Sequence, residues 1–319
     1  MTDSLQDPVT AVVASLAQVA VVVLVAPLLV GLMRQVRARM EGRVGAGVWQ
    51  PWRDLRKLFR RQPVTPVGTT WAFRAAPLLL VATALVVAAT IPLLTTHTVL
   101  DRVADLFAVV GLLTLGTVVL ALAALNTGTA FGGMGASREV TVLALVEPTI
   151  LVAVFALSAR VGSTNLGQLV DAALHDPLRV VSPASLLAAA ALLVVTVAET
   201  GRLPVDNPAT HLELTMLHEA MVLEYSGVDL GLVELAASMR LTLLLGLVAS
   251  LFTPWGIATS LAGLPLALVA FTAKVAVLAA ALAAAEVLLA KLRLFRVPEL
   301  LAGSFVLALL AATTSFFLA

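Results

Sequence analysis

Five carboxylates lie within 26 residues of a chain that is otherwise apolar, and they are its main candidates for chemistry. They are Glu199, Asp206, Glu213, Glu219 and Glu224. A carboxylate in or beside a bilayer is costly unless it finds a counter-ion or water. Grouped carboxylates with raised or coupled pKa values can hold and pass protons. The segment therefore predicts a proton path, and the alternative is a cytoplasmic helix whose charges simply face water.

A helix over residues 207–225 is predicted for most of this segment. It begins with an Asn-Pro pair, in which asparagine suits the N-cap and proline the first helical position. Helical geometry puts Glu213 and Glu224 on one face, about 16 Å apart along the axis. His211 and His218 are seven residues apart, which is not a metal-ligand spacing. We therefore expect no metal site in this segment.

Two further carboxylates, Glu139 and Glu147, lie at the start and inside of the fourth apolar stretch. Glu147 precedes Pro148, which removes a backbone donor and frees the carbonyl of Ala144, so a kink or a bound water is expected there. A carboxylate within a membrane and beside a helix irregularity indicates function. The alternative is a buried glutamate whose hydrogen bonds only hold helices together.

Two cations, Arg240 and Lys274, lie well within apolar stretches and need carboxylate partners or a hydrated cavity. Arg240 can pair with Glu147 or Glu234, and Lys274 with Glu286 or Glu147. Burial lowers the pKa of a lysine, which suits a proton relay. A purely structural ion pair is the open alternative for both cations.

The elements that must position these side chains are membrane-spanning helices. The chain has 319 residues, of which 60% are hydrophobic and 12% charged, and its mean hydropathy of +1.03 excludes a soluble globular domain. It has no cysteine, so it cannot hold a cysteine-ligated iron–sulfur cluster. Because a span needs about 20 apolar residues, we predict an all-α, polytopic membrane protein that forms one integral domain over residues 1–319. The eight predicted spans are residues 9–33, 73–95, 103–125, 140–162, 183–198, 231–252, 264–286 and 299–318.

The distribution of basic residues predicts how the chain is oriented. Arginine and lysine concentrate in the loop after the first span and beside the other odd-numbered connections. Basic loops stay on the cytoplasmic side. We therefore expect both termini outside and the loops at about 34–72 and 199–230 on the cytoplasmic face of the inner membrane.

The first cytoplasmic loop contains a predicted amphipathic helix. Apolar side chains alternate there with basic ones at helical spacing, and the set comprises Trp52, Arg53, Leu55, Arg56, Lys57, Leu58, Phe59, Arg60 and Arg61. Such a pattern is typical of a helix that lies in the membrane interface. The alternative is that these basic residues only set the orientation of the chain in the membrane and contact lipid headgroups, which would explain the charges equally well. Nucleic-acid binding is not expected of a membrane-embedded chain.

Several motifs together resemble the membrane subunit of complex I that lies at the junction with the peripheral arm, often called subunit 1 or the H subunit. The strongest are Ala198-Glu199-Thr200-Gly201-Arg202-Leu203-Pro204-Val205-Asp206 and Glu224-Tyr225-Ser226-Gly227. Gln50-Pro51, Asp54-Leu55-Arg56-Lys57, Arg138-Glu139 and Glu147-Pro148 match the same family. The resemblance covers nearly the whole chain.

Two departures and one further stretch are similar to one branch of this superfamily, the energy-converting nickel–iron hydrogenases of the formate hydrogenlyase, hydrogenase-4 and membrane-bound hydrogenase types. Gly201 stands where quinone-linked subunits usually have asparagine. The stretch at 211–227 is a few residues longer than its quinone-linked counterpart, and residues 290–299 look like the hydrogenase branch.

The resemblance implies a subunit with no catalytic residue and no prosthetic group of its own, one that anchors a redox module. The nickel–iron centre and iron–sulfur clusters would lie in partners: the large and small hydrogenase subunits and an iron–sulfur protein. Antiporter-like membrane subunits would move protons or sodium. The implied carboxylate path comprises Glu139, Glu147, Glu199, Asp206, Glu213 and Glu224, with Arg202 as counter-ion. Lys274 joins this set only because of its place in an apolar stretch. The residues expected to dock the hydrophilic module are Gln50, Asp54, Arg56 and Lys57.

Three other functions stay open from the sequence. The nearest is the quinone-site subunit of a respiratory NADH:quinone oxidoreductase, which predicts a quinone-sized cavity near the first span. A stand-alone ion transporter predicts activity from the single chain. A purely structural anchor predicts that its carboxylates affect assembly but not pumping.

Overall fold

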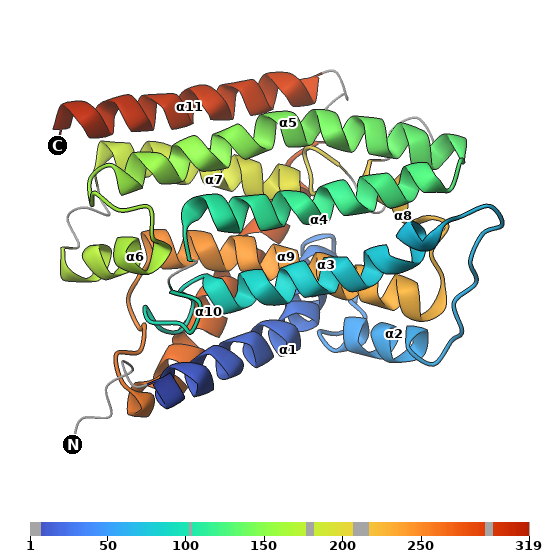
Figure 1. Ribbon diagram of the computed structural model, residues 1–319, viewed down its shortest axis with the longest axis horizontal. Helices are drawn as coiled ribbons and strands as arrows, with labels where there is room; N and C mark the ends of the chain where they lie inside the picture. Colours follow the sequence, from blue (N-terminus) through green and yellow to red (C-terminus); the bar gives the residue numbers. More distant parts are fainter. Residues whose placement is uncertain (1–7, 102–103, 177–181, 207–216, 291–295, 319) are drawn as a thin grey trace.

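The computed structural model describes residues 8–101, 104–176, 182–206, 217–290 and 296–318. Within these residues, eight long helices run back and forth along the molecule (Figure 1). They are α1 (Pro8–Met40), α3 (Trp71–Thr90), α4 (Leu106–Asn126), α5 (Ala130–Ser158), α7 (Pro183–Glu199), α9 (Gly227–Phe252), α10 (Leu264–Leu288) and α11 (Val297–Leu318). Three shorter helices connect them: α2 (Gln50–Leu58), α6 (Leu166–His175) and α8 (His218–Val222). A single 3-10 turn, Leu261–Gly263, precedes α10.

Seven of the long helices have the length and apolar composition needed to cross a membrane. The eighth, α7, has 17 residues and therefore a length of about 25 Å, slightly less than the hydrocarbon core of a bilayer. The predicted all-α, polytopic membrane fold is confirmed. The boundaries differ most at α5, which begins at Ala130 rather than at residue 140. Glu139 consequently lies well inside a helix and not at its entrance.

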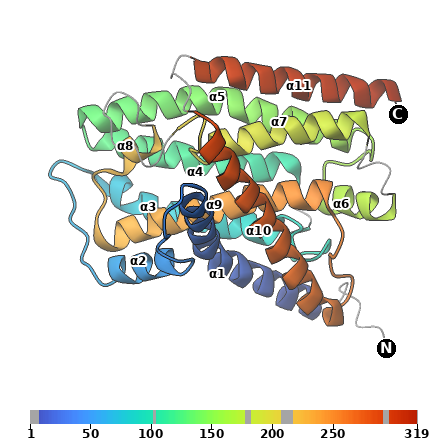
Figure 2. The same ribbon diagram turned by 180° about the vertical axis from the view of Figure 1, so that it is seen from behind.

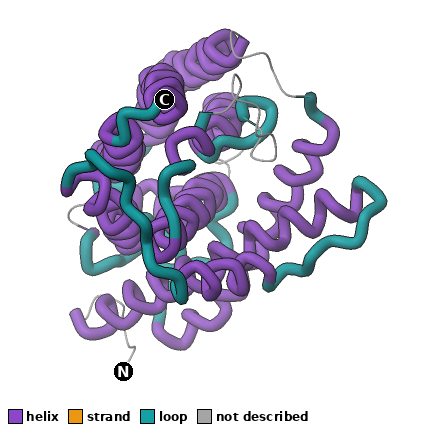
Figure 3. Tube along the Cα trace, turned by 90° about the vertical axis from the view of Figure 1, so that its right-hand side faces the viewer, coloured by secondary structure: helices purple, strands orange, loops and turns teal. Residues whose placement is uncertain are grey.

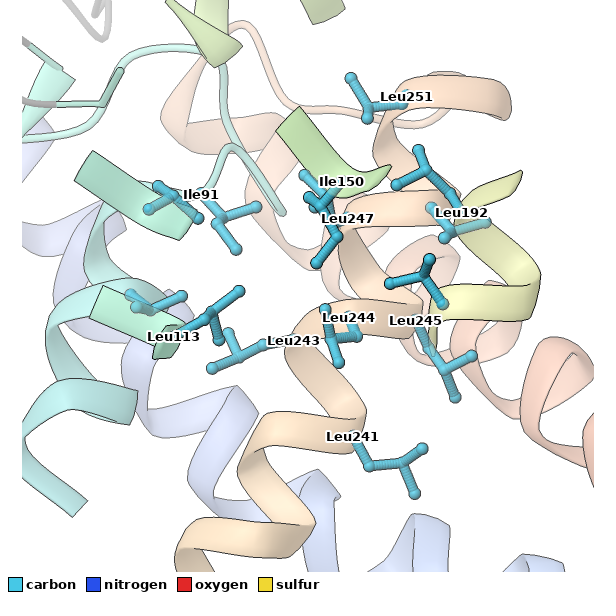
Figure 4. Packing of buried hydrophobic residues seen from close by; sticks show 14 of the residues in the cluster. Ile91, Leu113, Ile150, Leu192, Leu241, Leu243, Leu244, Leu245, Leu247 and Leu251 are labelled. Atoms are coloured by element: carbon cyan, nitrogen blue, oxygen red, sulfur yellow. The ribbon is translucent and has the colours of Figure 1, made fainter. Parts of the chain in front are cut away.

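The centre of the bundle is α9. In its most apolar stretch 78% of the residues are buried, whereas the share in the other six candidate spans is 28–50%. Helix α9 packs against α1, α3, α7 and α10. Every residue from Leu241 to Leu251 is buried, and Figure 4 shows leucines pointing from this helix in all directions towards Ile91, Ile150 and Leu192. The burial of α9, and not its apolar character alone, shows that other helices enclose it.

The outer helices enclose α9 in layers. In Figures 1 and 2, α11 lies along one side of the bundle over α5 and α7, and α1 lies on the opposite side. Figure 3 views the molecule from the end that carries α2 and α8, and the described part of the chain consists there of helices joined by loops. Two isolated bridges, Thr95 with Ala258 and Asp105 with Asn165, join loops in the described part.

The two ends of the bundle carry different elements. Helices α2 and α8 lie at one end, while α6, the beginning of α1 and the end of α11 lie at the other (Figure 1). The start of α1 and the end of α11 share one end because the eight long helices from α1 to α11 run back and forth. This arrangement agrees with the predicted grouping of the loops at 34–72 and 199–230, and the orientation of the bundle in a membrane stays a prediction.

The predicted continuous helix over 207–225 is wrong in the part that the structure describes. Leu217 has a non-helical backbone (φ −112°, ψ −84°), and α8 extends only to Val222. The Asp206 carboxylate accepts hydrogen bonds from the backbone N–H groups of Leu217 (3.2 Å) and His218 (3.3 Å), so a new helix begins there. A turn follows α8 at residues 223–224. The helical face predicted to carry both Glu213 and Glu224 therefore does not extend to Glu224. His211 and Glu213 lie outside the described residues.

Candidate functional site

A cavity of about 450 Å³ lies at the end of the bundle that carries α2 and α8. Its walls come from α1, α2, α4, α5, the end of α7, the loop after α7, α8 and α9. The ionisable residues that line it are Arg34, Arg37, Asp54, Glu139, Glu199, Arg202, Asp206, His218, Glu219, Glu234 and Arg240. A cavity of this size that several charged side chains line can hold ordered water. We call it the junction cavity.

The ion pair between Arg240 and Glu199 forms the inner wall of the junction cavity. Arg240 comes from the middle of α9, and Glu199 is the last residue of α7. The Arg240 side chain is 18% exposed and that of Glu199 4% exposed, so the pair is largely withdrawn from solvent. The predicted partners of Arg240, Glu147 and Glu234, are not the ones it binds. The charge of Arg240 nevertheless acts on Glu139 and Glu147.

Glu139 and Glu147 lie two turns apart on α5, about 12 Å along the helix axis. Glu139 lines the junction cavity together with His218, Arg240 and Asp206. Glu147 is partly buried and lies outside the lining, yet Arg240 also acts on it electrostatically. Arg240 is therefore the charge that the cavity and the membrane-embedded Glu147 share.

A second buried cluster joins α1, α10 and the loop after α7. The fully buried carboxylate of Glu286 binds Arg37, and its other oxygen lies 3.6 Å from a guanidinium nitrogen of Arg202. Burial lowers the pKa of Arg202, and the charge of Glu286 opposes that shift. Arg202 is predicted from the resemblance as a counter-ion for the carboxylate path. Its partner is Glu286, a residue that the sequence does not place at the site.

Two glycines allow the backbone to approach this region. Gly201 has φ +58°, a left-handed conformation that glycine and asparagine tolerate best. A Cβ atom at Gly135 would lie 2.9 Å from Ala220 Cβ and 3.1 Å from the Leu217 carbonyl oxygen. Gly135 therefore lets α8 pack directly on α5, which brings His218 towards Glu139.

Lys274 does not join the junction cavity. Its ammonium donates hydrogen bonds to the backbone carbonyls of Thr253 and Trp255, just after the end of α9 at the opposite end of the bundle. The predicted pairs with Glu286 and Glu147 are wrong. The physical reason is that a long lysine side chain can reach carbonyls left without partners at a helix end.

The remaining predicted path residues have different surroundings. Asp206 is 3% exposed and lines the cavity, but its carboxylate also fixes the start of α8, so it has a structural function. Glu224 lies in the turn after α8, is partly exposed and is not part of the lining.

The four residues predicted for docking lie on two faces of α2. Gln50 donates a hydrogen bond to Asp54 (2.9 Å), and Asp54 lies 3.7 Å from Arg34 at the rim of the junction cavity. Helical spacing places Lys57 near these two residues and Arg56 on the opposite face. Arg56 lines a separate groove with Trp49, Trp52, Arg53, Phe59 and Arg60.

Several cavity residues have no place in the predicted path. Arg34 and Arg37 serve in the sequence only as topology signals, Glu219 is one of the five clustered carboxylates without being assigned to the path, and Glu234 enters only as a possible partner of Arg240. For Arg34, Arg37 and Glu234, the available signal is a position within about two turns of the end of α1 or the start of α9. In the described part of the chain no group of three or more histidine, aspartate or glutamate side chains is placed to hold a metal ion.

The fold and the cavity define a class: a multi-pass helical membrane subunit with an ionisable cavity at one end. A model of the NADH dehydrogenase family matches residues 12–317, so the chain belongs to that family.

Relatives with known names divide between two kinds of complex. The chain is 35% identical to formate hydrogenlyase subunit 4 of Escherichia coli over 93% of its own length and 96% of the relative's. It is 35% identical to hydrogenase-4 component C of the same organism over 78% of each chain. It is 27% identical to NADH-quinone oxidoreductase subunit 8 of Rhodothermus marinus over 72% of its own length and 69% of the relative's.

A solved structure has the same fold. A chain of the membrane-bound sulfane sulfur reductase, an archaeal respiratory membrane complex, matches with a TM-score of 0.81 over 95% of this chain and 98% of its own length. The two sequences are 20% identical, so the likeness concerns the fold.

Proposed function

We propose that this chain is the membrane anchor and coupling subunit of a redox-driven ion-pumping complex that contains a nickel–iron hydrogenase. One observation carries the proposal: carboxylates and arginines from six helices and the loop after α7 converge on a single cavity at one end of the bundle. The near full-length similarity to formate hydrogenlyase subunit 4 supports the hydrogenase link over the quinone-linked one.

The proposed coupling runs through Arg240. A change of charge or protonation in the junction cavity alters the Arg240–Glu199 ion pair. When the pair weakens, Arg240 interacts more strongly with Glu139 and Glu147, whose charges already act on it. Electrostatic coupling of this kind is strong where the surroundings are poor in water. Glu147 then passes the change into the membrane.

The outer part of the path includes Glu224 and Glu213, on the side of the hydrophilic module. Glu213 lies outside the described residues, so its place in the path follows from the family resemblance. Asp206 and Arg202 hold the loop after α7 in position, and Lys274 has no part in the proposed path because it lies at the other end of the bundle.

The proposed partners supply the redox chemistry. Large and small hydrogenase subunits and an iron–sulfur protein hold the nickel–iron centre and the clusters, and antiporter-like membrane subunits move protons or sodium. The hydrophilic module docks over the cavity rim, where Gln50, Asp54 and Lys57 lie. The complex resides in the inner membrane, with the cavity on the cytoplasmic side.

Glu147→Gln tests the coupling path. In the purified complex reconstituted into vesicles, this variant is expected to abolish ion pumping, because the path loses its carboxylate inside the membrane. Hydrogenase activity with an artificial electron acceptor is expected to stay within about twofold of the parent. Asp171→Asn is the matched control, since Asp171 is exposed on α6 at the opposite end. Unchanged pumping by Glu147→Gln would refute the proposed path.

A quinone site is the second candidate, and one observation favours it. The junction cavity has the volume of a small-molecule pocket and reaches Pro27 and Val30 of α1, near the first span as a quinone site requires. Its many charged side chains fit water and protons better than a hydrophobic tail. Inhibition of turnover by a quinone-site inhibitor, competitive with added quinone, would favour this candidate.

A further inference from the structure

The outer face of α2 forms a groove that combines positive charge with aromatic surface. The groove is lined by Trp49, Trp52, Arg53, Arg56, Phe59 and Arg60. These residues recur at helical spacing, so they share one face of α2. Trp49 and Phe59 are 63% and 40% exposed, so the aromatic surface is open. We call this feature the α2 groove.

Contacts with α1 and α9 fix the direction in which the α2 groove faces. The Trp52 indole N–H donates a hydrogen bond to the carbonyl of Leu24 on α1 (3.2 Å). Leu55 is buried beneath α2, and the Phe59 ring packs close to Gly231 of α9. Helix α2 is therefore held against α1 and α9 partly by two of the groove's own aromatic side chains, Trp52 and Phe59, and the groove lies beside both helices. The groove arginines stay exposed.

The arginines of the α2 groove are available to a ligand. Arg53, Arg56 and Arg60 are exposed, and none of them forms an ion pair with another residue in the described part of the chain. The nearby carboxylate of Asp54 lies on the other side of α2, where it meets Arg34 and Gln50. The groove consequently has an uncompensated charge that matches an anion.

The surroundings of the groove identify the kind of anion. Leu24, whose carbonyl accepts the Trp52 hydrogen bond, is 57% exposed on a helix long and apolar enough to cross the membrane, as expected of a side chain that faces acyl chains. The groove thus adjoins the lipid-facing surface of α1. Tryptophan favours the boundary between acyl chains and headgroups, and arginine binds phosphate through paired N–H groups.

We propose that the α2 groove binds the phosphate headgroup of an anionic phospholipid. The three arginines contact the phosphate, and the rings of Trp49, Trp52 and Phe59 cover the glycerol and upper acyl region. The bound lipid would fix α2 against α1 and α9 and so hold one wall of the junction cavity in place. This inference rests on the membrane fold and not on the hydrogenase link.

Tryptophan quenching by brominated lipids tests the proposal. The chain has four tryptophans, and replacing two of them, Trp71→Phe and Trp255→Phe, leaves Trp49 and Trp52 as reporters. The full-length chain is reconstituted into phosphatidylcholine vesicles that contain brominated phosphatidylglycerol or brominated phosphatidylcholine. We expect at least a tenfold higher apparent affinity for phosphatidylglycerol, because each arginine near an anionic headgroup contributes about a fivefold preference.

A pair of triple variants separates a built site from general surface charge. Arg53→Gln, Arg56→Gln and Arg60→Gln together are expected to reduce the preference to about twofold or less. Arg39→Gln, Arg43→Gln and Arg61→Gln together remove the same charge from outside the groove and are expected to leave the preference intact. Equal loss in both variants would mean that only surface potential acts, and the proposal would be overturned.

A second measurement does not depend on folding of the single chain. The phospholipid that stays bound to the purified complex is extracted and quantified by mass spectrometry. The groove variant is expected to retain less phosphatidylglycerol than the control variant. The lipid site would be refuted if the two variants retained equal phosphatidylglycerol and brominated lipid did not quench the tryptophans. A protein partner would then be indicated over the groove.

Discussion

At the scale of single residues, the molecule depends on charges that are buried in pairs. Arg240 with Glu199, and Glu286 with Arg37 and Arg202, each bring together side chains from different helices. Removing one partner of a buried ion pair leaves the other charge buried without compensation, whereas removing both partners costs far less stability. Comparing a single with a double variant of such a pair therefore tests it directly.

Arg240→Gln is expected to lower the free energy of unfolding by about 3–5 kcal/mol, because it leaves the Glu199 carboxylate buried without its partner. The double variant with Glu199→Gln should recover much of that loss. Denaturant-induced unfolding in detergent measures both. Arg43→Gln is the control, since Arg43 is paired with Glu41 at an exposed site and should cost at most about 1 kcal/mol. An Arg240→Gln variant as stable as this control would contradict the expectation.

Tyr225 offers a spectroscopic test, because it is the single tyrosine of the chain. Its hydroxyl donates a hydrogen bond to the Phe73 carbonyl (3.0 Å), and the two rings stack with centroids 4.2 Å apart. Burial, with a smaller contribution from the charge of Asp229, raises the pKa of Tyr225. We expect the folded protein to show little tyrosinate absorbance at about pH 10, near the ordinary pKa of tyrosine.

The sign of this pKa shift also fixes a pH dependence of stability. The folded protein holds the phenol proton more tightly than the unfolded chain. The resulting stabilisation is therefore complete below the ordinary pKa and is lost as the pH rises towards the folded pKa. Tyrosinate absorbance that appears with an unshifted midpoint while the helical circular dichroism is unchanged would disprove the buried state.

At the scale of elements, the close packing of α8 on α5 decides how the junction cavity is closed. A five-residue helix has little intrinsic stability, so α8 depends on its neighbours and on the Asp206 hydrogen bonds. Gly135 is the position at which α5 makes room for it.

Gly135→Leu is therefore expected to displace α8 and to reduce coupled activity of the complex at least tenfold. Gly133→Leu is a suitable control on the same helix, because a Cβ atom there would meet no neighbour within 4 Å. Pumping per hydrogen turnover in reconstituted vesicles measures the effect. Equal behaviour of the two variants would show that α8 does not need this contact.

The elements also show what sequence reasoning could and could not predict. Apolar length alone predicts the helices, because a bilayer demands about 20 apolar residues per span. It misplaces the start of α5, since Arg138 and Glu139 look like an end to a span although they continue a helix. The partners of Arg240, Lys274 and Glu286 depend on how distant helices pack, and helical spacing within one segment contains no information on that packing.

At the scale of the whole molecule, the arrangement of the ends predicts how the protein lies in the membrane. The chain has no cysteine, so single introduced cysteines report accessibility cleanly. Val67 in the loop between α2 and α3 and Asp171 on α6 are exposed at opposite ends.

We expect a membrane-impermeant maleimide to label the variant Asp171→Cys in intact spheroplasts and to label Val67→Cys only after the cells are opened. This outcome follows from basic loops that stay in the cytoplasm. The reverse pattern would place the junction cavity outside and would exclude docking of a cytoplasmic redox module.

The enclosure of α9 has a consequence for the membrane in which the protein works. Bilayers of different thickness act on lipid-facing helices by tilting them or by exposing their ends. Because α9 is surrounded by other helices, its depth is set by protein neighbours and not by the length of the acyl chains. Arg240 therefore keeps its height relative to Glu199 and Glu147 when the lipid composition changes, and the spacing of these charges is insulated from the growth conditions of the cell.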